Sequence, residues 1–253
     1  AIGEADEVWA EILEDAEKGR MQPFYRQEKR TDLSHLPIPR RDLFPSKGYL
    51  FHNLIQTTRG CPYDCEFCSV TALHGRSYRM RPVSQVEKEI QSLERSKAYI
   101  FFVDDNLVGN LSHAKELLSM LSHYRLRWVS QGPIHIAEDD EMVSLMAKAG
   151  CHGLFIGLES LREENLNLMG KRINRVGAYE RGIQKLHDAG IGVYASFVFG
   201  YDYDDPSVFD EFLEFAERNR IEGAFLPLLT PFPGTRIYQR LKQEGRLLTE
   251  DWS

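Results

Sequence analysis

The sequence predicts an α/β fold in which parallel strands alternate with helices. Six apolar runs rich in β-branched and aromatic residues recur from residue 50 onward, and a segment with helical periodicity follows each. Gly150 and Gly190 come directly after two of these segments, where a glycine typically ends a helix. Six units are too few to close an eight-stranded barrel. We therefore expect a partial (β/α)6 TIM-like barrel with parallel strands, preceded by a helix and an irregular linker.

The first 49 residues differ in pattern from the rest of the chain. Trp9, Ile12, Leu13 and Ala16 recur at helical spacing and predict an amphipathic helix within residues 1–19. Residues 21–48 hold several prolines and many charges without a sustained period, which is typical of a linker. We therefore expect two parts: a helix and linker over residues 1–49, and the barrel over residues 50–253.

The barrel part is expected to contain six strands and six helices. The predicted strands are residues 54–58, 99–103, 127–134, 153–158, 192–199 and 224–229. The predicted helices are residues 83–95, 112–123, 140–149, 174–189, 206–220 and 236–244. The strands are apolar throughout, which indicates that both faces of the sheet are covered. Ser160 followed by Glu163 predicts a capping box at a helix start.

Composition excludes several classes of protein. The chain has 253 residues, a net charge of −7 and no apolar stretch long enough for a membrane helix. We therefore expect a cytoplasmic protein without a transmembrane segment, and no general binding of nucleic acid. Arg76, Arg79 and Arg81 form a local basic cluster that either steers an acidic ligand or is a solvated loop. Four cysteines in so long a chain do not make a disulfide framework.

Polar residues gather where the predicted strands end. They are the segments 57–68, 104–106, 130–132, 157–160, 200–204 and 230–235. In parallel α/β folds the carboxyl ends of the strands meet on one face, and chemistry collects there. The sequence therefore predicts one site built from all six strands.

Among the polar residues at the strand ends, the spacing of three cysteines is the strongest indication of function. Cys61, Cys65 and Cys68 follow the first strand within eight residues. Thiolates are the usual ligands of iron–sulfur clusters, and a complete 4Fe–4S site uses four. Three thiolates leave one iron open to a small-molecule ligand, as in catalytic zinc sites. The alternatives are a structural zinc site, with His74 or Cys151 as fourth ligand but without zinc-finger spacing, and three unrelated buried thiols.

Cys61-x3-Cys65-x2-Cys68, with the aromatic Phe67 before the third cysteine, resembles the defining motif of the radical S-adenosylmethionine (SAM) superfamily. The resemblance extends over roughly residues 50–253. It implies that Cys61, Cys65 and Cys68 hold a 4Fe–4S cluster whose open iron binds SAM. It also implies that SAM is cleaved reductively to a 5′-deoxyadenosyl radical, with electrons from a reductant such as a flavodoxin or ferredoxin.

Four segments together narrow the resemblance to cobalamin-dependent members of that superfamily. They are residues 58–62, 104–106, 157–160 and 230–235. In this subclass a cobalamin-binding domain precedes the barrel, and residues 3–6 resemble its end, so residues 1–49 are expected to be its tail. The chain itself holds no Asp-x-His-x-x-Gly cobalamin motif. The resemblance implies methylation or rearrangement of a small-molecule or lipid-like substrate, with cobalamin supplied through an upstream domain.

The same resemblance implies which residues bind SAM. They are Phe67, Asp104, Gln131, Glu159, Ser196 and Gly200. Phe67 is expected near the adenine or packed beneath the cysteine loop. Asp104 and its two neighbours bind the amino group of SAM or shape the loop after their strand. Glu159 binds the ribose or methionine end, or it is an acid favoured at a helix start.

Two of these residues match a known segment only in part. Ser196 and Gly200 fit the fifth-strand SAM segment of the superfamily incompletely, and Ser196 is alternatively a small residue lining the barrel. Gln131 is equally well placed to point into the barrel or out of it.

Two other functions are compatible with a cysteine triad. A tRNA methylthiotransferase-like radical SAM enzyme needs a second cluster, and the sequence has no second triad. A non-catalytic iron–sulfur or zinc-binding module would hold metal without binding SAM. The polar residues at the strand ends argue against that module, because a structural site does not need them.

Overall fold

The computed structural model describes residues 1–44, 53–93 and 99–251. The chain divides into two compact units, Ala1–Ile38 and Pro39–Ser253. The boundary expected between residues 49 and 50 lies outside the described residues, so it stays a prediction. Each unit is described by itself below.

The small unit is built around one helix. Helix α1 (Trp9–Glu17) begins eight residues later than the start of the segment in which a helix is expected. Asp15 on this helix is buried and accepts hydrogen bonds from the Tyr25 hydroxyl at 2.8 Å and from Arg20 Nε at 2.8 Å. Ile2 bridges to Arg26 in a parallel arrangement. The residues after α1 therefore fold back onto it, whereas the sequence predicts an irregular linker there.

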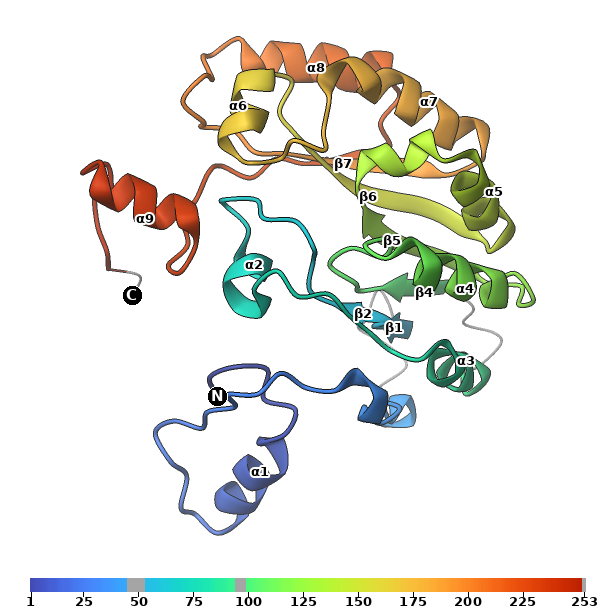
Figure 1. The fold of residues 1–253 in the computed structure, drawn as a ribbon, viewed down its shortest axis with the longest axis vertical. Helices are drawn as coiled ribbons and strands as arrows, with labels where there is room; N and C mark the ends of the chain where they lie inside the picture. Colours follow the sequence, from blue (N-terminus) through green and yellow to red (C-terminus); the bar gives the residue numbers. More distant parts are fainter. Residues whose placement is uncertain (45–52, 94–98, 252–253) are drawn as a thin grey trace. The chain divides into compact units, whose positions relative to one another are not determined.

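The larger unit contains a six-stranded parallel sheet (Figure 1). Its strands are β1 (Asn53–Ile55), β4 (Tyr99–Phe102), β5 (Arg127–Gly132), β6 (Cys151–Glu159), β7 (Gly192–Phe197) and β8 (Gly223–Phe225). They are hydrogen-bonded in that order, and every neighbouring pair is parallel. The predicted partial barrel of six parallel strands is confirmed.

Helices connect these strands along one side of the sheet (Figure 1). They are α3 (Val83–Gln91), α4 (Leu111–Leu121), α5 (Asp140–Lys148), α6 (Glu163–Leu168), α7 (Tyr179–Asp188) and α8 (Val208–Arg218), followed after β8 by α9 (Arg236–Gln243). Short 3-10 turns lie at η1 (Leu33–His35), η2 (Arg41–Leu43), η4 (Ile134–Glu138) and η5 (Val176–Ala178). Each predicted helix has a counterpart, although α7 begins five residues later than expected.

The start of α6 differs from the sequence expectation. The helix begins at Glu163 with Arg162 at the N-cap position. The Ser160 hydroxyl accepts a hydrogen bond from the Arg162 backbone N–H at 3.0 Å and so closes a local turn. The capping-box prediction is therefore wrong, because the serine lies two residues before the N-cap position.

Only one face of the sheet packs against helices. On β6, Leu154, Ile156 and Leu158 are buried in the core, while Phe155 and Gly157 between them stay partly exposed. Side chains alternate between the two faces of a strand, so this pattern separates a helix-covered face from an inner face. The expectation that both faces are covered is wrong, because the inner face of an incomplete barrel lines a cavity.

A short hairpin interrupts the alternation directly after β1. Strands β2 (Thr58–Arg59) and β3 (Arg79–Met80) pair antiparallel, and the cysteine loop with helix α2 (Ser69–His74) lies between them. The Arg81 backbone N–H adds a hydrogen bond to the Thr57 carbonyl at 2.8 Å. The predicted strand over residues 54–58 is thus two strands. The hairpin closes the cysteine loop at both of its ends.

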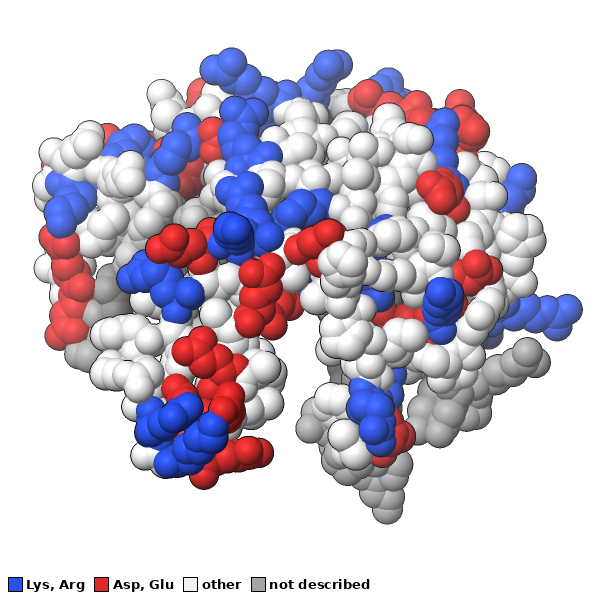
Figure 2. Space-filling model, turned by 60° about the horizontal axis from the view of Figure 1, so that its bottom comes forward, with Lys and Arg blue, Asp and Glu red and all other residues white. Residues whose placement is uncertain are grey.

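The surface carries both signs of charge. On the face shown in Figure 2, Lys and Arg side chains are interspersed with Asp and Glu side chains. Exposed ion pairs such as Arg218–Glu180 at 2.7 Å and Lys242–Glu250 at 2.6 Å join some of them. Such exposed pairs contribute about 0–1 kcal/mol each to stability. No helix among the described residues is long and apolar enough to cross a membrane.

Candidate metal and cofactor site

A cavity of about 510 Å³ opens at the carboxyl ends of the strands. All three cysteines of the predicted triad line it as free thiols. The structure brings seven of the nine predicted site residues to this cavity: Cys61, Cys65, Cys68, Phe67, Gln131, Glu159 and Ser196. Asp104 and Gly200 are not among the residues that line it.

Asp104 holds the chain segment at Thr57 and Thr58 in place and is not part of the cavity wall. It is fully buried, and its Oδ1 accepts hydrogen bonds from the backbone N–H and the hydroxyl of both Thr57 and Thr58. Burial raises the pKa of this carboxyl to about 6, although the hydrogen bonds from Thr58 and Thr57 act in the opposite direction. Because Asp104 does not line the cavity, the structure favours the loop-shaping alternative.

The two residues after Asp104 continue this support into the cysteine loop. Asp105 Oδ2 accepts a hydrogen bond from the Gly60 backbone N–H at 2.8 Å, and Asn106 Nδ2 lies 3.8 Å from Cys61 Sγ. Gly60 has a φ of +90°, and a Cβ at this position would collide with the Ser77 carbonyl oxygen. A glycine is therefore required where the chain turns into Cys61.

Two of the three thiols, those of Cys61 and Cys65, lie in an environment that disfavours their ionisation. Burial raises the pKa of Cys61, and it raises the pKa of Cys65 to about 11. The ammonium of Lys171 acts against this shift at both thiols. Metal ligands must be deprotonated, so a bound cluster would supply the positive charge that favours the thiolate form of these cysteines.

The donor set fits a cluster better than a single ion. Among the described residues, no three His, Cys, Asp or Glu side chains converge closely enough to hold one metal ion. In an iron–sulfur cluster each thiolate binds a different iron, so three thiolates need not converge on one point. Cys151, one candidate for a fourth zinc ligand, begins β6 and is buried at the opposite end of that strand from the cavity. His74, the other candidate, is buried and does not line the cavity.

Glu159 and Lys171 form a largely buried ion pair on the cavity wall. The Lys171 ammonium donates a hydrogen bond to Glu159 Oε1, and the two side chains are only 12% and 7% exposed. A Cβ on Gly157 would collide with both charged groups, so the glycine makes room for the pair. Burial acts to lower the pKa of Lys171, but the neighbouring Glu159 carboxylate and Cys65 raise it overall.

Sequence reasoning missed Lys171. The residue follows α6 in a short basic run, where it reads as an ordinary surface charge. Nothing in the local pattern shows that the chain turns it inward toward Glu159. The alternative for Glu159 as a helix-start acid is not supported, because α6 begins four residues later and Glu159 itself ends β6 with a φ of +70°.

The remaining predicted residues are placed as follows. Phe67 lines the cavity and also packs against the core, and its position near the adenine of SAM stays a prediction. Gln131 faces into the barrel rather than out of it. Ser196 on β7 lines the cavity, but Gly200 lies beyond it and donates its backbone N–H to Asp204 Oδ2 at 2.7 Å.

The arginines of the basic cluster before α3 lie in different environments. Arg81 is 4% exposed, and its Nη1 lies 2.8 Å from Glu89 Oε2 and 2.7 Å from the Gln56 carbonyl oxygen. Arg76 is exposed, and none of the three arginines lines the cavity. The structure therefore assigns Arg81 to a buried ion pair rather than to the steering of a ligand.

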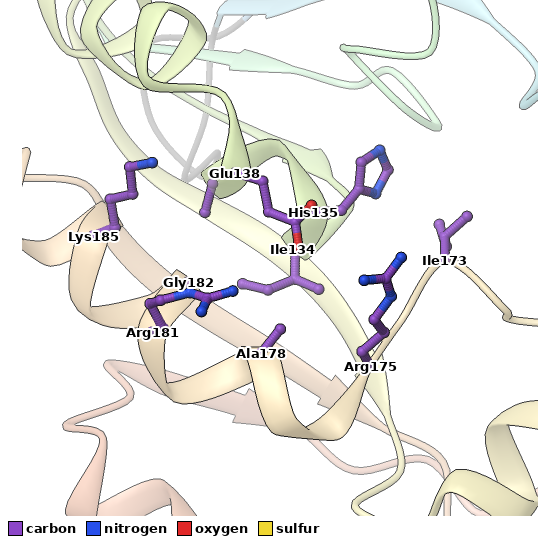
Figure 3. A pocket seen from close by; sticks show the side chains of 10 residues that line it. Ile134, His135, Glu138, Ile173, Arg175, Ala178, Arg181, Gly182 and Lys185 are labelled. Atoms are coloured by element: carbon purple, nitrogen blue, oxygen red, sulfur yellow. The ribbon is translucent and has the colours of Figure 1, made fainter.

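A second cavity of about 420 Å³ lies between η4 and α7 (Figure 3). Figure 3 shows Arg175 and Arg181 on either side of Ile134, with Lys185 and Glu138 farther along the rim. No thiol lines this cavity, so the chemistry that the cysteines offer belongs to the first one.

Comparison with known proteins places the chain in a family. Residues 55–216 match the sequence profile of the Radical SAM superfamily. The chain is 31% identical over 258 residues to bacteriochlorophyllide d C-12(1)-methyltransferase of Chlorobaculum tepidum, which covers 99% of this chain and 56% of that protein. It is 30% identical over 259 residues to hopanoid C-2 methylase of Rhodopseudomonas palustris, covering 99% and 49%. The chain thus spans about half the length of these curated relatives.

Solved structures show the same fold. The radical SAM methyltransferase TsrM from Kitasatospora setae, with tryptophan substrate and a SAM analogue bound, superposes with a TM-score of 0.69 at 22% identity over 76% of this chain and 38% of that chain. The cobalamin-dependent SAM radical enzyme OxsB superposes with a TM-score of 0.65 at 16% identity over 96% and 45%. With the profile match over most of the barrel, these findings show that the chain belongs to the radical SAM superfamily, whose cofactors are a 4Fe–4S cluster and SAM.

Proposed function

We propose that this chain is the radical SAM barrel of a cobalamin-dependent methyltransferase that acts on a small-molecule or lipid-like substrate. One observation carries the proposal: Cys61, Cys65 and Cys68 share a single cavity with the charged pair Glu159–Lys171. The similarity to bacteriochlorophyllide and hopanoid methyltransferases along nearly the whole chain supports methyl transfer.

The cysteine loop holds the cluster, which supplies the electron for reductive cleavage of SAM when it is bound. Cys61, Cys65 and Cys68 are its ligands. Asn106 Nδ2 donates a weak hydrogen bond to the Cys61 sulfur. The Lys171 ammonium lies close enough to Cys65 to favour its thiolate form. Both groups therefore offset part of the negative charge of the three thiolates.

SAM binds along the wall formed by β5, β6 and β7. Glu159 and Lys171 offer one negative and one positive group, which match the amino and carboxylate groups of the methionine end. Phe67 offers an aromatic face on the same cavity, and Gln131 and Ser196 offer polar groups on the neighbouring strands. These assignments rest on the position and charge of each side chain in the cavity.

The substrate side of the cavity is apolar. Three exposed apolar side chains line the cavity at the end of β8 and after it: Phe225, Leu228 and Phe232. They are 59%, 70% and 50% exposed. An apolar surface of this kind is typical of a binding site for another apolar molecule. It favours a flat or polycyclic hydrophobic substrate, which would also exclude water from the radical.

The remaining components of the reaction lie outside the described cavity. We propose that cobalamin reaches the barrel mouth through a domain upstream of Ala1, and that a flavodoxin or ferredoxin supplies the electrons. We also place the protein in the cytoplasm, because a cluster that must be reduced is kept in a reducing compartment.

Methyl transfer is favoured over the alternatives considered from the sequence. A methylthiotransferase needs a second cluster, and the chain has only four cysteines. A non-catalytic metal module leaves the buried Glu159–Lys171 pair without a role. A relative named as an anaerobic magnesium-protoporphyrin IX monomethyl ester cyclase is 25% identical over 193 residues, so ring closure is the second candidate reaction.

The proposal is tested with anaerobically reconstituted protein, cobalamin, reductant and SAM that carries a deuterated methyl group. We expect a candidate tetrapyrrole or hopanoid substrate to gain the labelled methyl group, as measured by mass spectrometry. A product that has lost hydrogen without gaining the label would instead establish ring closure.

The cluster assignment has its own matched pair of variants. Cys65→Ala is expected to abolish reductive SAM cleavage and to lower the iron content, because a cluster ligand is lost. Cys151→Ala is expected to keep both, because this thiol is buried in the core and its sulfur lies 3.7 Å from the Gly153 carbonyl oxygen. Full SAM cleavage by Cys65→Ala, or loss of iron from folded Cys151→Ala, would refute the assignment.

A further inference from the structure

Glu66 lies inside the cysteine motif but has no role in the cavity. It stands directly after Cys65, is 7% exposed as a residue, and is not among the residues that line the cavity. Its carboxylate instead receives two hydrogen bonds from Arg240 on α9: Nη2 to Oε1 at 2.9 Å and Nε to Oε2 at 3.3 Å. This pair joins the cysteine loop to the helix that follows the last strand.

The backbone around Glu66 is fixed from two sides. Its N–H donates to the Met169 carbonyl at 2.9 Å, and its carbonyl accepts from the Ile237 N–H at 3.0 Å. Arg236 Nη2 adds a hydrogen bond to the Asp64 carbonyl at 2.5 Å. The end of α6 and the start of α9 therefore hold the middle of the cysteine loop in place.

The charge of Glu66 has a consequence for an iron–sulfur site. A cluster held by three thiolates becomes more negative when it accepts an electron, and its reduction potential depends on the net charge around it. A buried carboxylate directly after the ligand Cys65 would oppose reduction. Arg240 compensates that charge, and it has two further carboxylates nearby, Asp202 Oδ2 at 3.3 Å and Glu244 Oε1 at 3.4 Å.

We propose that Glu66 and Arg240 are positioning residues that hold the cysteine loop on α9 and set the reduction potential of the cluster by charge compensation. The inference rests on the cluster assignment made under the proposed function. It also predicts an effect that a purely structural ion pair would not have. Removing the negative charge and removing the positive charge must shift the potential in opposite directions.

The test is a potentiometric titration of the reconstituted cluster in the full chain at a pH where carboxylates are ionised. Glu66→Gln should make reduction easier, and Arg240→Gln should make it harder, each by about tenfold in the one-electron equilibrium, which corresponds to about 59 mV. Arg240→Lys keeps the charge and should stay near the wild type. The double variant Glu66→Gln/Arg240→Gln should also return close to the wild-type potential.

The exposed pair Arg218–Glu180 between α8 and α7 provides the control. Arg218→Gln and Glu180→Gln should leave the potential unchanged. Shifts of the same sign in Glu66→Gln and Arg240→Gln, or shifts no larger than those of the control variants, would overturn the inference. If Arg240→Gln does not retain iron, Glu66→Gln and Arg240→Lys still decide the question.

Iron and sulfide contents are measured on the wild type before the titration. A wild type that holds no cluster overturns the proposed function and this inference with it. A wild type with an intact cluster whose potential does not respond to these charges overturns this inference alone.

Discussion

At the scale of single residues, the charged pair in the cavity is the most informative feature. Glu159 and Lys171 come from β6 and from the segment after α6, and both are largely buried. Burying two charges is costly unless each is paired. A pair kept at the wall of a ligand cavity is therefore positioned to exchange its internal partner for the charges of a ligand.

Replacing Glu159 tests this assignment. Glu159→Gln should weaken SAM binding about tenfold to a hundredfold, since a charge-assisted hydrogen bond contributes about 1.5–3 kcal/mol. The dissociation constant is measured anaerobically by equilibrium dialysis on protein with unchanged iron content. The control is Glu164→Gln, an exposed acid on α6. A SAM affinity that is equal in both variants would remove Glu159 from the binding site.

Asp104 gives a prediction for the pH dependence of stability. Its pKa is about 6 in the folded protein and 3.8 in the unfolded chain, so between these values the folded state holds a proton that the unfolded state has lost. The stabilisation is complete below pH 3.8 and is lost as the pH rises through 6, by up to about 3 kcal/mol. Asp104→Asn should remove this dependence.

The measurement is urea unfolding of the metal-free protein at several pH values, with wild type and Asp104→Asn treated identically. Subtracting the free energy of unfolding of the variant from that of the wild type at each pH cancels the contributions of all other carboxylates. A difference in the free energy of unfolding that stays constant from pH 4 to pH 7 would show that Asp104 does not titrate in this range.

At the scale of elements, the β2–β3 hairpin decides how the cysteines reach the cavity. It closes a loop that carries all three thiols, and residues 104–106 after β4 support the start of that loop. Because a cluster ligand must be held in place by its surroundings, this support belongs to the site as much as the thiols do.

Gly60 provides the test at this scale. Gly60→Ala places a Cβ against the Ser77 carbonyl at a left-handed position, so the turn into Cys61 must shift and the iron content after reconstitution should fall. Gly190→Ala has a similar positive φ of +76° but meets no atom within 4 Å. Both variants should lose about 1–2 kcal/mol of stability from backbone strain. Equal iron contents would contradict the role of this turn.

At the scale of the whole molecule, the open cavity raises the question of what covers it. Large apolar side chains line its substrate side and are exposed in this chain. If cobalamin binds between the barrel mouth and a second domain, the barrel offers only part of the binding surface. The cost of immobilising the ligand is the same for partial and complete surfaces, so affinity falls steeply when part is missing.

We therefore predict that residues 1–253 alone hold cobalamin weakly. Titration with hydroxocobalamin, followed by gel filtration and the visible spectrum, measures retention by this chain and by the same chain preceded by its natural upstream sequence. Retention should become tight only in the longer chain. Tight stoichiometric retention by residues 1–253 would contradict the prediction, and no retention in either would remove cobalamin from the proposed function.

The sequence by itself determined the six parallel strands and the cysteine triad. Apolar runs of strand length, separated by helical periodicity, specify the alternation because side-chain burial repeats within each element. The spacing of Cys61, Cys65 and Cys68 is equally local, because one loop carries all three thiols. Both kinds of information lie in neighbouring residues, so they can be read without knowing which distant segments meet.

Only the tertiary structure decided which side chains enter the cavity. Asp104 and Asp105 are adjacent and chemically alike, yet one is fully buried under Thr57 and Thr58 while the other lies on the cavity wall. Lys171 and Arg240 look like surface charges in the sequence, but they pair with Glu159 and Glu66. Electrostatic and hydrogen-bond partners depend on distances in space, and packing between segments far apart in the chain sets those distances.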